Sequence, residues 1–587
     1  MFSLKSLGRP TDRCHLCQFE PSKDEKVVTI IGDGRVSNEF QYDYTTARHK
    51  GGIMCHPECV RLAAPEPYKV SLAASYAYEP SMGEIKRRVA WLHSNLASDL
   101  ILSHYHYIPP EIRQMIVPLL LREYAVSKAA SCWLKLQGPS DICVDISTKV
   151  WARYTEFEGT QYISDLTNSP GNGYEAIFVP DSTQRIDCMY MSEDHLGVRQ
   201  ICFNTSAEAP PATPSFGVWW TTLQTASLSP KVIGKTDGIK LRDVGWAEPI
   251  PELSPVSTCA WEIPLLPTTR INFYTENNLS HDLFCNLLAP LCISNKAKPR
   301  MALLRCNDPD VTGYSVFCQD SPLYIHAHSE GENLSFYDHP THTHGIWLYM
   351  PLHHGEFLVD IWIRHGRVLP GISLVFRTNR GRIMTAGSYL FYHHHGMEHE
   401  GGGYSWKHLQ TLENAPSRLF FQYSSSISKL GVETPPPVLP KNAIGLSPFS
   451  PPPITISFQS YFFSRASLED VVEVTPCCME TAGVSAIIGL LLRYTDGHQW
   501  PVGEIRLDLL QDGIQVNPSE KMTLGFAVAH GLPYVANIRH LRVDRGQSDR
   551  SQLILLDIHW TGYLEWWFSL QQCKVYHNGR ASPVTRT

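Results

Sequence analysis

The chain has 587 residues, of which 43% are hydrophobic and 18% are charged, and its formal net charge is −7. This length exceeds what one hydrophobic core holds and predicts roughly three to five domains, while the low charged fraction excludes the basic surface of a nucleic-acid-binding protein. No apolar run approaches the roughly 20 residues of a membrane-spanning helix, and no signal peptide is recognisable. Sixteen cysteines are too sparse for a disulfide scaffold. We therefore expect a cytoplasmic or nuclear protein, not secreted, with free or metal-bound thiols and no nucleic-acid or membrane partner.

Two cysteine pairs lie near the N-terminus. Cys14 and Cys17 stand in "CHLC", and Cys55 and Cys59 stand in "CHPEC". A structural zinc ion takes four ligands at the corners of a tetrahedron, and two cysteines separated by two or three residues reach one ion from a single turn. The spacing predicts one structural zinc ion held by these four thiolates, with buried thiols or a single functional pair as the alternative. Three histidines nearby are spare candidate ligands: His15, His49 and His56.

Two helices are predicted after the cysteine pairs. The first carries an apolar stripe at spacings of three and four residues, formed by Ile85, Val89, Leu92, Leu96 and Leu100. The second begins near Pro110, because proline suits the first position of a helix. Pro118 should kink or split this second helix, since proline lacks the amide hydrogen that the helix needs.

The segment "IPPEIRQMIVPLLL" within the second helix resembles the opening of an F-box. That signature is an apolar residue, proline, any residue, glutamate and aliphatic residues at helical spacing. The matching residues are Ile108, Pro109, Glu111, Ile112, Ile116 and Leu119. In the F-box family this module docks on the adaptor subunit of a cullin-type ubiquitin ligase, so the resemblance implies such a partner for these six residues. An amphipathic helix that packs inside the chain is the alternative.

Short strands between turns replace the helical pattern from about residue 140 onward. In "GEFLVDIWIRHGRVLPGISLVFRTNRGR", the apolar residues Val359, Ile361 and Ile363 alternate with the residues between them, which predicts a strand. This segment resembles the hairpin of jacalin-type lectins, and the matching residues are Glu356, Phe357, Leu358, Leu374, Phe376, Thr378, Asn379 and Gly387. The resemblance implies a beta-prism of antiparallel sheets, and residues 487–508 resemble another part of that domain. The family's Gly-x-x-x-Asp sugar loop is not in register, so the resemblance bears more on fold than on sugar binding.

Thirteen of the 26 histidines fall between His326 and His408. Alternating residues of a strand share one face, so His326 and His328 could bind one metal ion, and Glu332 completes the first half of a cupin-like pattern. The second half of that pattern is missing. We favour solvated loops for "DHPTHTHGIW" and for the triple histidine further along. A cupin-like, metal-dependent enzyme that uses His326, His328 and Glu332 is the alternative.

These patterns predict a multidomain, mainly β protein with a small zinc-stapled N-terminal module, a short F-box-like helical segment and antiparallel beta-prism-like or sandwich-like domains. The expected segments are a zinc-binding module over 1–68, an F-box-like segment over 69–138, a β-rich domain over 139–260, a jacalin-like domain over 261–431, a proline-rich linker over 432–453 and a second jacalin-like domain over 454–580. The arrangement resembles a large group of fungal multidomain proteins with these modules. It implies a non-enzymatic intracellular recognition protein that docks on the ligase adaptor and binds a glycan or peptide. An accessory protein without chemistry of its own is a further alternative.

Overall fold

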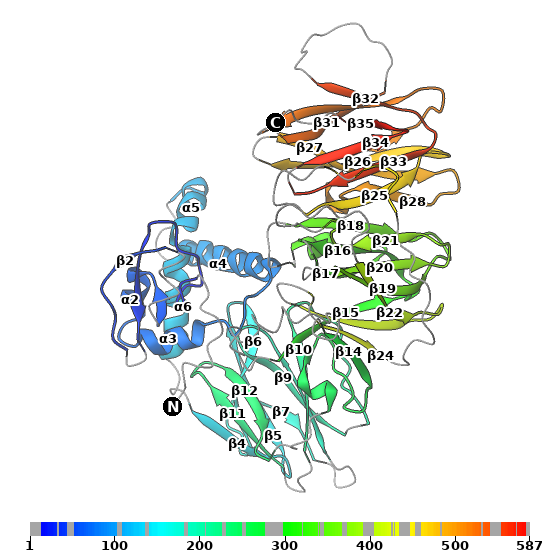
Figure 1. Ribbon diagram of the computed structural model, residues 1–587. Coiled ribbons are helices and arrows are strands. Elements are labelled where there is room, and N and C mark those ends of the chain that lie inside the picture. Colours follow the sequence, from blue (N-terminus) through cyan, green and yellow to red (C-terminus); the bar gives the residue numbers. More distant parts are fainter. Residues whose placement is uncertain are drawn as a thin grey trace. The chain divides into compact units, whose positions relative to one another are not determined.

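The computed structural model describes residues 13–582 apart from a set of short segments, which Figure 1 draws as a thin grey trace. The segments left out are 32–33, 44–51, 103–107, 135–139, 181–185, 206, 226–229, 249–253, 276–297, 320, 339, 341–344, 367–371, 391–403, 424–426, 428, 434–446, 452, 454–459, 482–483, 530–531, 541–552 and 571. The chain forms two compact units. Unit 1 comprises Met1–Arg270 and Asn286–Met301, and unit 2 comprises Ile271–Cys285 and Ala302–Thr587.

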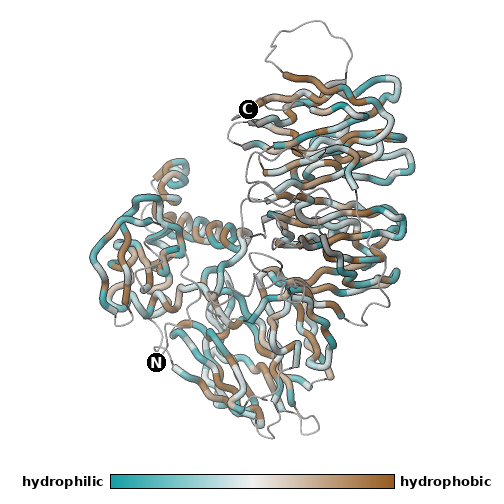
Figure 2. The backbone as a smooth tube through the Cα atoms, in the orientation of Figure 1, coloured by the Kyte–Doolittle hydropathy of each residue, from teal (hydrophilic) through white to brown (hydrophobic). Residues whose placement is uncertain are grey.

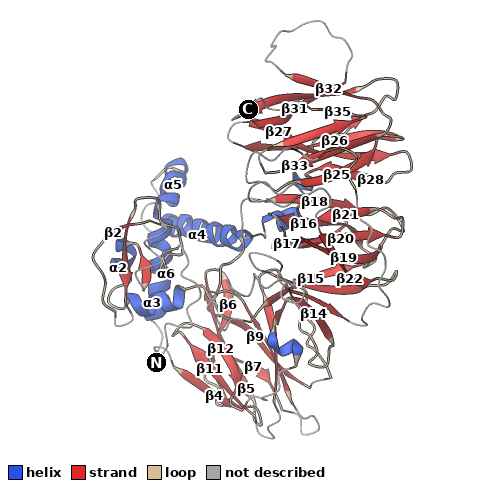
Figure 3. Cartoon of the chain, viewed as in Figure 1, coloured by secondary structure: helices blue, strands red, loops and turns tan. Residues whose placement is uncertain are grey.

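Strands are the commonest element of the described chain, and the longer helices gather near its N-terminus (Figure 3). The predicted mainly β fold class is therefore confirmed. Within the described ranges, none of the helices is long and apolar enough to cross a membrane.

The N-terminal part of unit 1 packs a small antiparallel sheet, of strand order β2-β1-β3, with a group of helices. The elements are β1 (Lys26–Ile30), β2 (Phe40–Gln41), β3 (Ile53–Cys55), α2 (Pro57–Leu62), α3 (Pro67–Ala74), α4 (Met82–Leu102), α5 (Pro110–Ile116), the 3-10 helix η2 (Val117–Leu120) and α6 (Leu121–Leu134). The break at η2 confirms the effect predicted for Pro118, where the α-helix gives way to a 3-10 turn.

One hydrophobic core joins the cysteine-rich module to the helices. Leu16 and Val28 from the module are buried in the same cluster as Leu92 of α4 and Val126 of α6. Tyr162, from the β-rich part of unit 1, belongs to this cluster as well. The segments predicted as separate modules over 1–68 and 69–138 thus share their interior.

The rest of unit 1 consists of the antiparallel sheets β12-β11-β4 and β6-β5-β7 and of the strands β13-β10-β8-β9, where β13 also pairs in parallel with Arg300 and Met301 at the start of β15 (Arg300–Cys306). Their elements are β4 (Asp141–Asp145), β5 (Val150–Phe157), β6 (Thr160–Thr167), β7 (Tyr174–Phe178), β8 (Cys188–Glu193), β9 (Val198–Asn204), β10 (Trp219–Gln224), β11 (Lys231–Thr236), β12 (Leu241–Trp246), η3 (Pro255–Thr258) and β13 (Ala260–Trp261). A buried ion pair ties these sheets to the helices, because Arg88 of α4 donates to Glu158 in the β5–β6 turn at 2.6 Å. Breaking such a pair leaves an uncompensated buried charge, so it fixes the position of α4.

Unit 2 is built from antiparallel sheets along its whole length. In its central part the orders are β14-β24-β23-β15, β17-β16-β18 and β21-β20-β19-β22. The elements are β14 (Ile271–Thr275), β15 (Arg300–Cys306), β16 (Val311–Cys318), β17 (Pro322–Ser329), η5 (Leu334–Asp338), β18 (Ile346–Pro351), β19 (Leu358–Gly366), β20 (Ile372–Thr378), β21 (Ile383–Ala386), β22 (Tyr404–Thr411), β23 (Ser417–Gln422) and β24 (Lys429–Glu433).

The predicted hairpin is present as β19 and β20, in which Ile361 lies opposite Phe376. The alternation along β19 also holds, but both of its faces are buried. Ile361 and Ile363 are enclosed on one face, and Asp360 and Arg364 are enclosed on the other. Asp360 is tolerated there because it forms an ion pair with Arg377 and lies 3.1 Å from His408 Nε2.

The C-terminal part of unit 2 has sheet orders β25-β33-β34-β35 and β29-β26-β27-β31-β30-β32, with β28 paired to β27. The elements are β25 (Phe462–Ser467), β26 (Val471–Thr481), β27 (Val484–Tyr494), β28 (Gln499–Gly503), η6 (Leu507–Leu509), β29 (Ile514–Gln515), β30 (Met522–Ala529), β31 (Leu532–His540), β32 (Ile554–Ile558), β33 (Tyr563–Phe568), β34 (Cys573–His577) and β35 (Arg580–Ala581). The central and C-terminal parts touch, since the Trp347 amide donates to Glu504 at 3.0 Å. The proline-rich linker predicted between them lies mostly outside the described residues.

Candidate metal centres and docking surface

The two cysteine pairs meet in the N-terminal module because two short backbone elements bring them together. Cys14 and Cys17 flank a tight turn, which the hydrogen bond from the Gln18 amide to the Cys14 carbonyl closes at 2.7 Å. His56 precedes the first residue of α2, and Cys59 lies within that helix. The His15 amide donates to the Met54 carbonyl at 3.0 Å, which holds the turn against β3.

The ligand atoms of Cys14, Cys17, His56 and Cys59 lie within 4.8 Å of one another, and all four residues are buried. His56 Nδ1 is 3.4 Å from Cys17 Sγ and 3.6 Å from Cys59 Sγ. A tetrahedral zinc ion with ordinary bond lengths separates its ligand atoms by about 3.5 Å, so the observed distances suit such an ion. The donor set fits a closed structural site of three thiolates and one imidazole. We call these four residues the cysteine centre.

One ligand of the cysteine centre differs from the prediction, because His56 takes the place of Cys55. Cys55 is fully buried and its thiol interacts with that of Cys14, yet it is not part of the compact group. Cys55 and His56 are adjacent in the chain, and the side chains of both contact the Cys14 thiol. Of the other spare candidates, His15 contacts the Ser75 hydroxyl at 3.3 Å and His49 lies outside the described residues.

Electrostatics within the cysteine centre favour one thiolate. Burial raises the pKa of the Cys14 thiol, but hydrogen bonds from Cys17, Cys55 and Cys59 outweigh burial and lower that pKa well below its ordinary value. Burial and the neighbouring Cys14 raise the pKa of Cys17. A divalent cation would supply the positive charge that the remaining thiols need in order to ionise.

The six residues matched to the F-box lie on or next to α5 and η2. Pro109 and Glu111 are exposed, and Ile108 and Ile116 are half-buried. Ile112 and Leu119 are 45% and 77% exposed. Met115 and Leu120, which the match did not include, are 69% and 40% exposed. We call these last four the docking face: Ile112, Met115, Leu119 and Leu120.

The chain itself does not cover the docking face among the described residues. Val117 and Leu121 turn the opposite way into the core of unit 1 and are buried. The hydrophobic residues of α5 are seen in brown in Figure 2. Large apolar side chains that are exposed close together in one segment mark an interaction site more often than scattered ones do.

The second metal-capable group is the predicted alternative site, and the structure brings its three residues together. His326 and His328 lie on β17, and Glu332 lies in the turn that follows. The carboxylate of Glu332 stands between the two imidazoles, 2.9 Å from His326 Nε2 and 2.5 Å from His328 Nδ1. His342, His344 and the triple histidine at 393–395 lie outside the described residues.

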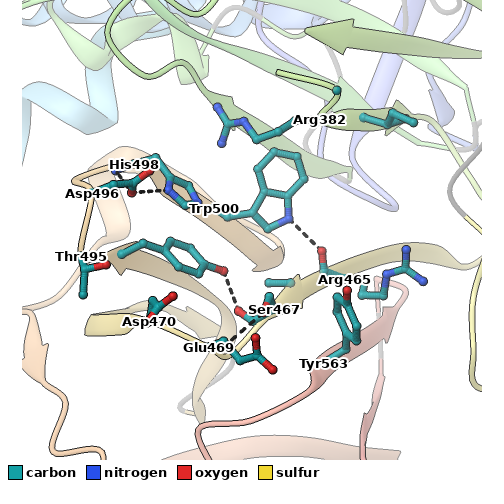
Figure 4. A pocket seen from close by; sticks show the side chains of 14 residues that line it. Arg382, Arg465, Ser467, Glu469, Asp470, Thr495, Asp496, His498, Trp500 and Tyr563 are labelled. Atoms are coloured by element: carbon teal, nitrogen blue, oxygen red, sulfur yellow. Dashed lines mark hydrogen bonds and ion pairs between the residues drawn. The ribbon is translucent and has the colours of Figure 1, made fainter. Parts of the chain in front are cut away.

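A pocket of about 660 Å³ opens where the central and C-terminal parts of unit 2 meet (Figure 4). Its lining comes from the β20–β21, β25–β26 and β27–β28 turns, with Tyr563 from β33. Trp500 is fixed by its Nε1, which donates to the Arg465 carbonyl at 2.8 Å, and by the Arg382 guanidinium stacked 4.7 Å from its ring. Asp470 and Asp496 add carboxylates at the exposed rim. Sequence patterns did not indicate this pocket, because its residues are distant in the chain.

No protein-family model matches the chain, and no curated protein is similar to it in sequence. Inference about function therefore rests on the geometry of the described residues.

Proposed function

We propose that the protein is a non-enzymatic recognition protein, which docks on a partner through the docking face and binds a ligand through unit 2. The exposure of Ile112, Met115, Leu119 and Leu120 on two consecutive helical turns carries the proposal. Folded chains rarely leave four large apolar side chains together in water.

The energetics favour a partner with an apolar groove. Full burial of an exposed large aliphatic side chain contributes about 1.5–3 kcal/mol. The exposed fractions of the four side chains add up to little more than two fully exposed ones, so their burial contributes on the order of 3–7 kcal/mol before the cost of association is subtracted. A helix that lays such residues into a groove is a recurring mode of recognition. The α-helix α5 ends at Ile116, and the 3-10 helix η2 that follows it carries Leu119 and Leu120. The apolar surface available to a partner therefore extends beyond the end of α5.

The partner we propose is the adaptor subunit of a cullin-type ubiquitin ligase. Two of the residues matched to the F-box, Ile112 and Leu119, belong to the docking face, and Glu111 lies exposed beside them. Because that adaptor operates in the cytoplasm and nucleus, the proposal places the protein there as well. The cysteine centre then has a structural role, since its core is continuous with the helices that present α5.

The ligand of unit 2 is proposed to be a glycan or a peptide, and the domains that hold it to be jacalin-like beta-prisms. The antiparallel pairing of β19 with β20 and the three- and four-stranded sheets around them support this part. The pocket offers aromatic faces on Trp500 and Tyr563 next to the carboxylates of Asp470 and Asp496. Aromatic faces with a few convergent polar groups are the usual lining of a small-ligand site.

A pull-down with the purified adaptor tests the docking proposal. We expect Ile112→Asp and Leu119→Asp to abolish capture, because each places a charge in a contact that excludes water. Gln114→Asp is the matched control: it adds the same charge to an exposed position of α5 without removing an apolar side chain. Failure of the unmodified protein to bind the adaptor, or loss of capture in all three variants alike, would remove the ligase part of the proposal.

Binding to immobilised glycans and peptides tests the pocket. We expect Tyr563→Ala and the double change Asp470→Asn with Asp496→Asn to weaken binding of the captured ligand. Val528→Ala, a change at an exposed apolar residue of the same unit, should leave it unchanged. Equal binding by all three proteins would show that the ligand lies elsewhere.

A further inference from the structure

The group His326, His328 and Glu332 has the chemistry of a metal site that differs in kind from the cysteine centre. We propose that these residues bind one divalent transition-metal ion through His326 Nε2, His328 Nδ1 and the Glu332 carboxylate. The inference goes beyond the proposed docking and ligand recognition and does not depend on either. We call the three residues the histidine triad.

The backbone places the three side chains together for simple geometric reasons. His326 and His328 are two residues apart on β17, so their side chains leave the same face of the sheet. A turn then reverses the chain, with the Glu332 amide donating to the Ser329 carbonyl at 3.4 Å. Gly331 adopts a positive φ of 70° within this turn, a conformation that suits glycine. The reversal brings Glu332 back over the two imidazoles.

The distances within the histidine triad approach those that one metal ion imposes. Metal–nitrogen and metal–oxygen bonds are about 2.0–2.2 Å, so two such ligands at a right angle are separated by about 3 Å. The observed separations are 2.9 Å from Glu332 to His326 and 2.5 Å from Glu332 to His328. All three ligand atoms lie within 4.8 Å of one another. Two histidines with one carboxylate are a recognised donor set for divalent iron and its neighbours in the transition series.

The surroundings hold the imidazoles in the orientation that a metal would require. Ser315 Oγ, which is fully buried, lies 2.7 Å from His328 Nε2 and leaves Nδ1 to face Glu332. A hydrogen bond to the second ring nitrogen is the usual support of a metal-bound histidine. The His326 ring stacks on Phe336 with a centroid distance of 3.8 Å and an interplanar angle of 6°. Tyr349 meets the His328 ring edge-on at 5.2 Å.

One side of the histidine triad is open, unlike the cysteine centre. The His328 side chain is only 2% exposed, whereas those of His326 and Glu332 are 21% and 18% exposed. An ion can enter from that side. Three protein ligands also leave coordination positions for water or for an oxygen-donor ligand, as in metal sites that act on a bound molecule. The inferred occupant is therefore an exchangeable divalent ion with at least one position not filled by protein.

Equilibrium dialysis of the full-length protein against Co²⁺, with its zinc retained, tests the inference. We expect one Co²⁺ per chain in addition to zinc, with visible absorption but without a sulfur-to-cobalt charge-transfer band, because no thiolate belongs to the triad. The side chains of Glu332 and His326 are partly exposed, so the conservative changes Glu332→Gln and His326→Gln should preserve the fold. Each change should weaken Co²⁺ binding by more than about 10- to 100-fold. His354→Gln, at an exposed histidine of the same unit, is the matched control and should bind as the unmodified protein does.

Two outcomes would overturn the inference. One is Co²⁺ that enters only with the sulfur charge-transfer band, which would locate it at the cysteine centre. The other is binding that survives both Glu332→Gln and His326→Gln in proteins with unchanged melting temperatures, which would assign the ion to other surface histidines. A third variant, His328→Asn, removes the most deeply buried donor. If this variant stays folded, its Co²⁺ affinity shows what His328 contributes to binding.

Discussion

The cysteine centre and the histidine triad are both groups of metal-ligating side chains, yet their surroundings differ in a consistent way. In the cysteine centre all four donors are buried, and they belong to the same core as α4 and α6. In the histidine triad one donor is buried and two are partly exposed on the face of β17 and its following turn. The first group is part of the interior of unit 1, and the second is attached to a sheet that other contacts already hold together.

The difference teaches what each group contributes to its unit. Where the donors are the core, binding energy of the ion is folding energy, because the apolar side chains around it cannot pack until the ligands meet. Where a sheet already holds the donors in place, the ion adds little to the stability of the fold. Its open coordination positions can then bind water or a ligand. Loss of the ion from the cysteine centre should therefore lower the stability of unit 1. Changes in the histidine triad should instead affect the binding of its ion and of a ligand to that ion.

The largest effect is expected at the cysteine centre. Cys59→Ser or His56→Asn should release one zinc ion per chain and lower the unfolding free energy of unit 1 by at least about 3 kcal/mol, because the ligands and the helices share one core. Elemental analysis with thermal denaturation followed by circular dichroism measures both quantities. Cys143→Ser, at an exposed thiol, is the control and should change neither.

The same measurement decides between the two neighbouring candidates. Cys55→Ser should retain zinc, since Cys55 is outside the compact donor group. A protein that loses zinc on Cys55→Ser and keeps it on His56→Asn would restore the four-cysteine set that the spacing predicted.

A proton-dependent effect of about 3 kcal/mol is expected in unit 2. Burial raises the pKa of Glu504 to about 7 from its ordinary value of 4.5. The folded protein therefore holds this proton more tightly than the unfolded chain, so the stabilisation is complete below about pH 4.5 and is lost as pH rises through about 7. Glu504→Gln should remove this part of the pH dependence, by about 3 kcal/mol between the two limits.

Urea unfolding at pH 5 and pH 8 provides the readout for Glu504. The unmodified protein should lose more stability than Glu504→Gln over that interval, and other titrating groups cancel in the difference. Equal losses in the two proteins would mean that the carboxylate is already ionised in the fold.

A smaller effect is expected for support of the histidine triad. Ser315→Ala removes the hydroxyl that faces His328 Nε2 and should weaken Co²⁺ binding by about 10- to 100-fold. Thr312→Ala, an exposed change on the same strand β16, is the control. Isothermal titration of both proteins gives the affinities. Identical affinities would indicate that His328 does not bind the ion through the geometry described above.

The smallest effect is expected for stability at the docking face. Leu119→Asp should change the unfolding free energy by less than about 0.5 kcal/mol, because the side chain already lies in water. Val117→Asp, two residues away and fully buried, should destabilise unit 1 by several kcal/mol. Thermal melts of the pair show whether α5 and η2 stand outside the core, and a collapsed melt for Leu119→Asp would place the docking face inside the folded chain.

Several features could be predicted from the sequence because they depend on local chemistry. The spacing of the cysteine pairs, the break at Pro118 and the β19–β20 hairpin all follow from neighbouring residues. That His56 rather than Cys55 completes the compact group could not be predicted, since both side chains contact Cys14 and the difference lies in their distances to the other donors. The pocket at Trp500 could not be predicted either, because the turns that line it meet only through the packing of distant strands. The burial of Asp360 likewise depends on partners from other strands, Arg377 and His408.

The split at Pro118 has a mechanical consequence for the docking face. None of the described residues of α5 is buried, whereas η2 contributes Val117 to the core and α6 contributes Leu121. The anchor of this segment thus lies at its C-terminal end, and α5 is held mainly by its connection to that anchor. Few buried contacts mean a low free energy of local opening, so the amides of α5 should exchange with solvent much faster than those of α6. A partner could therefore reorient α5 at small cost while the interior of unit 1 stays as it is.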